Sequence, residues 1–190
     1  MTSSAVALTS HPTTPSETVR RIDVKVRRTG LDVLELEYVL VGDLARLLIP
    51  AESVPRRADK LWQHTCFEAF VAAMETTGYH ELNFSPSTEW AIYRFTAYRE
   101  GMTPVAPALA PRVSLQRGGD RLTLAVQIQL ESFPELRGGA QLRLGLSAVI
   151  EDAQHGLTYW ALAHPLSKPD FHHLRGFVCE LPAGSRSPDV

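Results

Sequence analysis

The chain of 190 residues carries 19 Lys and Arg against 21 Asp and Glu, a formal net charge of −2. Because this balance comes without a long run of one sign, it disfavours a nucleic-acid-binding protein. The two cysteines, Cys66 and Cys179, lack C-x-x-C spacing, which disfavours a disulfide framework and a thiolate zinc site. The sequence shows neither a signal segment nor an apolar run as long as a membrane span. We therefore expect a cytoplasmic protein with no membrane or nucleic-acid partner.

Both ends of the chain have the composition of flexible segments. Residues 1–17 are rich in Ser, Thr and Pro and show no apolar period, which predicts a disordered tail. Residues 182–190 contain Gly184, Pro188 and scattered polar residues, and they predict a second flexible end. The folded domain is then expected over residues 18–181.

Within this domain, apolar residues recur at every second position, which is the spacing of half-buried strands. The segments 22–26 and 34–40 flank the turn signal Thr29-Gly30 and predict a pair of antiparallel strands. The segments 122–130 and 142–150 repeat the same alternation. Strands separated by short turns at this spacing are typical of a sandwich. The sequence therefore predicts an all-β protein, an antiparallel β-sandwich of the jelly-roll type.

Three further strands are expected in the middle of the chain, over 62–73, 79–85 and 89–97. Their short connections predict an antiparallel meander. A helix is the alternative for 67–74, because Ala and Met favour helices, but the following residues alternate and favour a strand.

Residue parity divides this meander into two faces. An apolar core face is predicted for Phe67, Ala69, Val71, Leu82, Phe84, Ala91, Tyr93 and Phe95. A mixed polar and aromatic face is predicted for His64, Cys66, Glu68, Glu81, Asn83, Trp90 and Arg94. A flat ring such as Trp90 beside carboxyl and amide groups suits sugar recognition. The alternative is an ordinary solvated sheet face with a charged pair such as Glu68 and Arg94.

A second group of aromatic and imidazole side chains lies between Tyr159 and His173. His164, Asp170 and one of His172 or His173 have the donor types of a transition-metal site, although their spacing matches no known metal motif. The alternatives are contact with a ligand, or a loop that prolines make rigid and whose imidazoles bond to the backbone.

Catalysis is the weaker interpretation, because the chain has no G-x-S-x-G elbow, Walker loop, G-x-G-x-x-G or H-E-x-x-H motif. Cys66 is expected to be a buried thiol rather than a reactive thiolate. Met74 or Met102 could form an axial pair with a histidine for non-covalent haem, although no C-x-x-C-H attachment sequence is present.

Several longer strings carry a resemblance to a known family. They are Leu61-Trp62-Gln63-His64-Thr65-Cys66-Phe67-Glu68-Ala69-Phe70, Asn83-Phe84-Ser85-Pro86-Ser87, Trp90-Ala91-Ile92-Tyr93-Arg94-Phe95, Tyr98-Arg99-Glu100-Gly101-Met102, the segment 144–152, Tyr159-Trp160-Ala161-Leu162, His164-Pro165 and Lys168-Pro169-Asp170-Phe171-His172-His173. With these strings, the chain resembles the bacterial DOMON-like domain proteins, a subgroup related to the carbohydrate-binding modules of family nine. The resemblance implies a jelly-roll β-sandwich and, in the wider superfamily, sugar or haem ligands.

We therefore expect a non-catalytic module that binds a small molecule, a saccharide or glycan fragment, and that holds no resident cofactor or metal. A haem-binding domain and a metal-dependent enzyme that uses the C-terminal His-rich loop are the alternatives. A pocket is expected to be bounded by at least two of three segments: the start of the meander, its polar face and the loop 159–173. The candidate ligand-binding residues are Trp62, His64, Glu68, Asn83, Trp90, Arg94, Tyr159, Trp160, His164, Asp170, His172 and His173.

Overall fold

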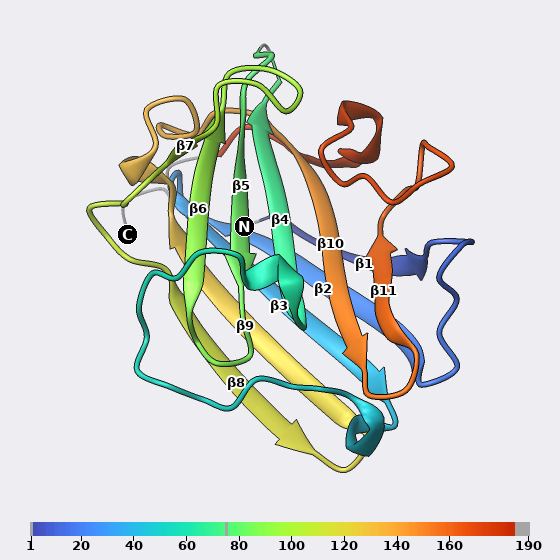
Figure 1. Ribbon diagram of the computed structural model, residues 1–190. Helices are drawn as coiled ribbons and strands as arrows, with labels where there is room; N and C mark the ends of the chain where they lie inside the picture. Colours follow the sequence, from blue (N-terminus) through green and yellow to red (C-terminus); the bar gives the residue numbers. More distant parts are fainter. Residues whose placement is uncertain (1, 75, 185–190) are drawn as a thin grey trace.

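The computed structural model describes residues 2–74 and 76–184, and its strands form two antiparallel layers packed face to face (Figure 1). The front layer contains β4 (Cys66–Ala73), β5 (Tyr79–Phe84), β6 (Trp90–Phe95), β10 (Leu142–Asp152) and β11 (Gly156–Ala161), with the short strands β7 (Thr103–Pro104) and β12 (Cys179–Leu181). The back layer contains β1 (Thr2–Ser10), β2 (Val19–Thr29), β3 (Val33–Gly42), β9 (Arg121–Gln129) and β8 (Arg112–Gly118). The predicted antiparallel β-sandwich is confirmed, and the jelly-roll type is consistent with its strand order.

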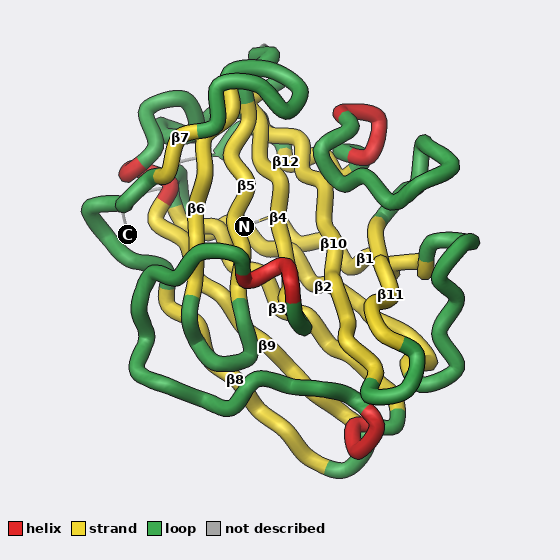
Figure 2. The backbone as a smooth tube through the Cα atoms, viewed as in Figure 1, coloured by secondary structure: helices red, strands yellow, loops and turns green. Residues whose placement is uncertain are grey.

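Helical structure in the described residues is limited to four 3-10 turns, which lie in the connections (Figure 2). They are η1 (Leu44–Arg46), η2 (Leu61–Gln63), η3 (Leu130–Ser132) and η4 (Leu174–Gly176). None of the helical segments in the described part of the chain has the length and apolarity that a membrane crossing requires. The segment 67–73 is strand, as expected, because it lies between β10 and β5 in the sheet, and only Met74 lies beyond the strand end.

The core between the layers is built from the alternation that the sequence shows. On β9, Leu122, Leu124, Val126 and Ile128 are buried, whereas Thr123, Ala125 and Gln127 are partly exposed. The apolar positions of β2, β3 and β10 meet them across the sandwich. Each buried Leu, Ile or Val side chain contributes roughly 1.5–3 kcal/mol by leaving water, so this interface is the main source of stability.

The N-terminal segment departs from the prediction of a disordered tail, because residues Thr2–Ser10 form β1. This strand pairs with β2 from Thr2 to Leu8, and Thr9 and Ser10 pair with β11. Val6 and Leu8 supply only a short apolar alternation, but the neighbouring strands provide partners for the backbone of β1. Composition alone does not reveal such partners. Most of the other predicted flexible end, 185–190, lies outside the described residues.

The predicted faces are right for β4 and β5 and wrong for β6. Trp90 pairs directly with Phe84, so the two side chains lie on the same side, and Trp90 and Ile92 point into the core. Ala91, Tyr93 and Phe95 therefore point outward. They are nevertheless buried, in a second apolar cluster with Phe70, Ala72, Tyr79 and Phe177, against which Leu61, Phe171 and Leu174 pack. A strand that is covered on both faces shows no alternation from which its inward side could be recognised.

Candidate functional site

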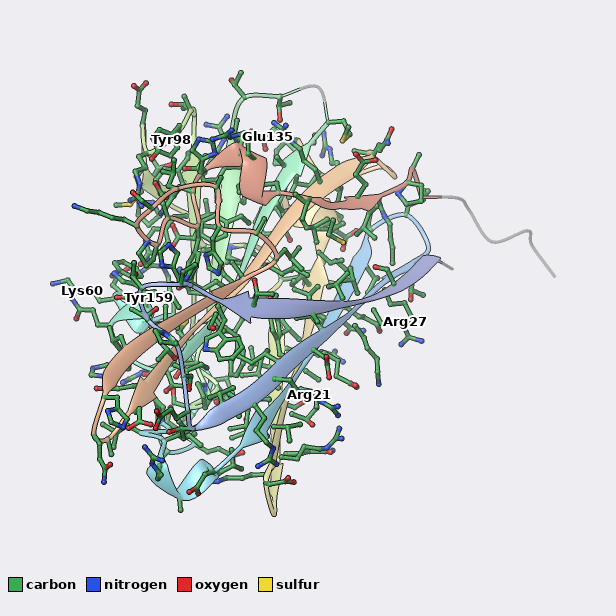
Figure 3. The ribbon with its side chains drawn as sticks, turned by 90° about the vertical axis from the view of Figure 1, so that its right-hand side faces the viewer. Arg21, Arg27, Lys60, Tyr98, Glu135 and Tyr159 are labelled. Carbon is green, nitrogen blue, oxygen red and sulfur yellow. The ribbon has the colours of Figure 1, made fainter. Side chains whose placement is uncertain are left out.

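A pocket of about 560 Å³ lies on the outer face of the front layer. In Figure 1, the turn η2 crosses in front of β4 and β5, and the segment that follows β11 folds back beside β10. Figure 3 shows Lys60, Tyr98 and Tyr159 on this side of the molecule, opposite Arg21 and Arg27 of the back layer. The pocket is lined by Trp62, Gln63, Glu68, Phe70, Glu81, Tyr93, Phe95, Arg99, Met102, Val149, Leu157, Tyr159, Pro169, Asp170, Phe171 and His172.

Two buried carboxyl groups from adjacent strands, those of Glu68 and Glu81, contribute to the lining. In the register of β4 and β5, Glu68 lies opposite Asn83 and Glu81 lies opposite Phe70, so both side chains leave the same face. The Ser147 hydroxyl donates to Glu68 Oε2 at 3.3 Å, and the Asn83 amide donates to Glu81 Oε1 at 2.7 Å. Burial, and for Glu68 also the neighbouring Glu81, raises the pKa of both carboxyl groups.

His172 closes the pocket over Glu81 and belongs to a hydrogen-bond chain. The backbone N–H of Arg99 donates to the Tyr79 hydroxyl at 3.1 Å, and that hydroxyl lies 2.9 Å from His172 Nδ1. The tyrosine oxygen accepts from Arg99, so its own proton is free to point toward Nδ1 of the imidazole. Nε2 lies 3.6 Å from Glu81 Oε2. Burial, together with the charge of Arg99, lowers the pKa of His172 to about 4, so the ring is neutral at pH 7.

The rim carries a charged pair, Arg99 and Asp170. Arg99 Nη2 lies 2.9 Å from Asp170 Oδ1, which also accepts the His172 backbone N–H at 3.0 Å, and the Tyr98 hydroxyl donates to Oδ2. Burial opposes ionisation of Asp170, but the hydrogen bonds from Tyr98 and Arg99 prevail and lower its pKa. The guanidinium charge of Arg99 is therefore already paired with the carboxylate of Asp170.

The turn that presents Arg99 depends on left-handed backbone. Arg99 has φ 56° and Gly101 has φ 62°. A Cβ at Gly101 would lie 2.3 Å from the Thr96 hydroxyl oxygen, so this position requires glycine.

An aromatic wall completes the pocket. Trp62, 37% exposed, meets Tyr93 edge to face with ring centroids 5.8 Å apart. The Tyr93 hydroxyl donates to Asp59 at 2.6 Å, and Asp59 also pairs with Arg57. On the opposite side, the ring of Tyr159 lies 6.1 Å from that of Phe171. Trp62 is thus the aromatic side chain of this wall that is most open to a ligand.

The structure brings five of the candidate residues into this pocket. They are Trp62, Glu68, Tyr159, Asp170 and His172, from the first and third of the three predicted segments. Asn83 is fully buried beside the pocket, where it holds Glu81 and lies 3.9 Å from Cys66 Sγ. Cys66 is a buried thiol, as expected, and burial raises its pKa well above the usual value.

Three other candidates, Trp90, Arg94 and Trp160, do not line this pocket. Trp90 points into the core because it pairs with Phe84. Trp160 also points into the core, where its indole N–H donates to the Thr158 hydroxyl at 3.1 Å. Arg94 shares the parity of Trp90, but it lies at the end of β6, is exposed and pairs with Glu135 at 2.8 Å.

The other candidate histidines, His64, His164 and His173, have partners outside the pocket. His64 lies 2.9 Å from a Glu151 carboxyl oxygen at the surface, and His164 bonds to the Thr9 carbonyl at 2.8 Å. His173 accepts the Arg175 backbone N–H at 3.2 Å and caps η4. The metal hypothesis for the His-rich loop is therefore not supported: residues 2–74 and 76–184 contain no group of three or more His, Cys, Asp and Glu that could hold a metal ion.

Met102 and His172 line the same pocket, which bears on the haem alternative. An axial ligand needs a free imidazole lone pair. In the structure, His172 Nδ1 is hydrogen-bonded to the Tyr79 hydroxyl and Nε2 lies 3.6 Å from Glu81 Oε2, so both ring nitrogens already face protein groups.

Several lining residues are not among the ligand-binding candidates that the sequence predicts. Residue parity predicts Tyr93 and Phe95 for the core, and it puts Glu81 on the polar face without a binding role. Arg99 and Met102 lie in the string Tyr98-Arg99-Glu100-Gly101-Met102, whose glycine after charged residues is a turn signal. That signal locates a turn, but it does not show that the turn closes over β5.

The chain matches no protein-family model and none of the curated proteins. Its fold resembles those of solved structures. One, from Bacteroides uniformis, is described as a "putative carbohydrate-binding protein"; it has a TM-score of 0.69 and 14% identity, with 92% of this chain and 84% of that chain covered. Another is a carbohydrate-binding module of family 9 from Caldicellulosiruptor kristjanssonii in complex with glucose, with a TM-score of 0.54, 12% identity and coverage of 93% and 82%.

A family 9 module from the same organism in complex with cellotriose has a TM-score of 0.51 and 12% identity, over 91% of this chain and 78% of that chain. The chain shares the fold of these modules. At such identities the likeness concerns the fold and not the binding residues.

Proposed function

We propose that the pocket on the outer face of the front layer binds a saccharide and that the protein is a non-catalytic carbohydrate-binding module. The observation that carries this proposal is the pairing of an accessible aromatic wall, Trp62 and Tyr159, with polar groups on the buried residues Glu68 and Glu81. A sugar ring presents an apolar face that packs on an indole and hydroxyl groups that need directional hydrogen bonds. The pocket offers both.

Two further observations support the proposal. The solved structures with a similar fold include modules in complex with glucose and with cellotriose. The strings around Trp62, Asn83 and Asp170 resemble DOMON-like domains, and we propose that the chain belongs to that group. These likenesses support the ligand class, and the pocket supplies the residues.

Titration calorimetry with glucose and with cellotriose tests the proposal. We expect saturable binding, and we expect Trp62→Ala to abolish it while the melting temperature stays within a few degrees, since Trp62 is partly exposed. The matched control is Val54→Ala, a change at an exposed apolar residue outside the pocket, which should leave both quantities unchanged. Undiminished binding by Trp62→Ala would place the saccharide elsewhere, and the absence of binding to both sugars would contradict this choice of ligands.

A further inference from the structure

The buried carboxyl groups of Glu68 and Glu81 have incomplete hydrogen bonding and no paired cation among the described residues. We propose that the saccharide held by this pocket carries a protonated amine, whose ammonium group binds between the two carboxyl groups and the surrounding aromatic rings. This inference rests on the proposed function and specifies its ligand as an amino sugar rather than a neutral one.

The first argument is the incomplete bonding of the carboxyl groups. Glu68 is 3% exposed and lines the pocket, and among the described residues its side chain has one partner, the Ser147 hydroxyl on Oε2, which leaves Oε1 without a hydrogen bond. Glu81 Oε1 accepts from Asn83, whereas Oε2 has only the distant His172 Nε2 at 3.6 Å. Two oxygens of buried acids therefore remain open to a donor from a ligand.

The second argument is that no Lys or Arg of the described residues pairs directly with the acids. Within residues 2–74 and 76–184, no Lys or Arg forms an ion pair with Glu68 or Glu81. Arg99 is the basic residue of the pocket lining; its charge lowers the pKa of Glu81, but its guanidinium pairs directly with Asp170 and not with either acid. Burying two carboxyl groups without a counter-charge is unfavourable, and a ligand that brings a positive charge relieves that cost.

The third argument is the aromatic surround. Phe70, Tyr93, Phe95 and Tyr159 line the pocket around the acids, with Trp62 at its edge. The faces of aromatic rings attract ammonium groups, and this attraction is stronger where water is excluded. An ammonium also offers three N–H donors, enough for both open carboxyl oxygens. A neutral hydroxyl offers one donor and no charge.

The proton balance follows from the same arrangement. Burial raises the pKa of both acids, and an ammonium group between them favours the carboxylate form, so any protonated acid in the pair releases its proton to solvent on binding. The other titratable groups that interact with the pair are Tyr38 on β3, Cys66 on β4, Tyr79 on β5, Tyr93 on β6 and Arg99 and His172 at the rim. At pH 7 the raised pKa values of the Tyr and Cys groups and the lowered pKa of His172 keep these five neutral. A proton released on binding therefore comes from the carboxyl pair.

The test compares three trisaccharides by calorimetry at pH 7: the trimer of glucosamine, the trimer of N-acetylglucosamine and cellotriose. We expect the amine to bind about tenfold more tightly than the two neutral trimers and to release a proton, which appears as a binding enthalpy that differs between phosphate and Tris buffer. Equal affinity for all three would overturn the amine inference and leave the proposed function standing. Binding of none of the three would overturn both.

A charge-removing variant makes the result specific to the pair. Glu81→Gln keeps the size of the side chain and should reduce the preference for the amine to about one, with loss of proton release. Glu37→Gln on the back layer, where the carboxylate pairs with Lys25, is the control and should retain the preference. A melting curve of each variant confirms that it is folded. A preference retained in folded Glu81→Gln would contradict the inference.

Discussion

The carboxyl groups of Glu68 on β4 and Glu81 on β5 emerge from the same face of two paired strands, and the charge of Glu81 raises the pKa of Glu68 beyond the effect of burial. Two acids in this position favour the protonated state. They determine the chemistry of the pocket and also a part of the pH dependence of folding.

The first prediction concerns stability at rising pH. A carboxyl group whose pKa is raised in the folded protein stabilises it fully below the unfolded pKa, and this contribution is lost as the pH rises through the folded value. The free energy of unfolding of the ligand-free protein should therefore fall above about pH 4.5 because of Glu68 and Glu81. Urea titrations between pH 4 and pH 9 measure this loss. The double variant Glu68→Gln, Glu81→Gln should show a smaller loss, and an unchanged slope would contradict the assignment.

A second prediction concerns the loss of stability as the pH falls. His80 points into the sandwich, its ring lies 5.1 Å from that of Phe133, its Nδ1 has no hydrogen-bond partner among the described residues, and burial lowers its pKa to about 4. A lowered pKa gives stability that is present above the unfolded value, about 6.5, and is lost as the pH falls toward 4. His80→Leu should flatten this loss, by an amount on the order of 3 kcal/mol at most. His155 is exposed, so His155→Leu serves as the control and should lose stability at low pH to the same extent as the unmodified protein.

The third prediction tests the assignment of the core. Phe84 is fully buried opposite Trp90, so Phe84→Ala should lower the free energy of unfolding by roughly 3–5 kcal/mol. Arg94→Ala removes an exposed ion pair with Glu135 and should change it by less than about 1 kcal/mol. Denaturant titrations of both variants decide the matter, since the reverse order would mean that the inward and outward faces are exchanged.

The N-terminal strand provides the fourth prediction. Leu8 on β1 is buried, and Leu8→Ala should cost roughly 2–5 kcal/mol, which a disordered tail could not produce. Ala7 on the same strand is exposed, and Ala7→Ser should change stability by less than about 0.5 kcal/mol. Equal melting temperatures for the two variants would show that β1 does not contribute to the sandwich.

How far the sequence predicts this fold depends on whether a strand has one covered face or two. On β9, the alternation of Leu122, Leu124 and Val126 reveals the inward side, because the other side meets water. On β6, Tyr93 and Phe95 are covered by the segments that contain Leu61 and Phe171, so both parities are apolar and the inward side is ambiguous. The register between Phe84 and Trp90 resolves it, and register is a property of the folded pair of strands.

The candidate site could likewise be predicted from the sequence only in part. The types of residue that build it, Trp62, Glu68 and His172, are recognisable in the sequence as aromatic, acidic and imidazole groups in dense local strings. Which strings meet depends on long-range contacts, such as those of Phe171 and His172 with Phe70 on β4 and Tyr79 on β5. Trp160 and Tyr159 are neighbours in the chain, yet one lies in the core and the other in the pocket.

The indole N–H signals of the three tryptophans test the central claim, that a saccharide binds on the outer face of the front layer, most directly. Trp62 lies in the wall of the pocket, whereas Trp90 and Trp160 are buried in the core, so they report on two separate regions. In a nitrogen-15 NMR titration with the glucosamine trimer and with cellotriose, assigned through Trp→Phe variants, the Trp62 signal should shift saturably while the other two stay in place. A saturable shift of Trp90 or Trp160 with an unmoved Trp62 signal would contradict the account.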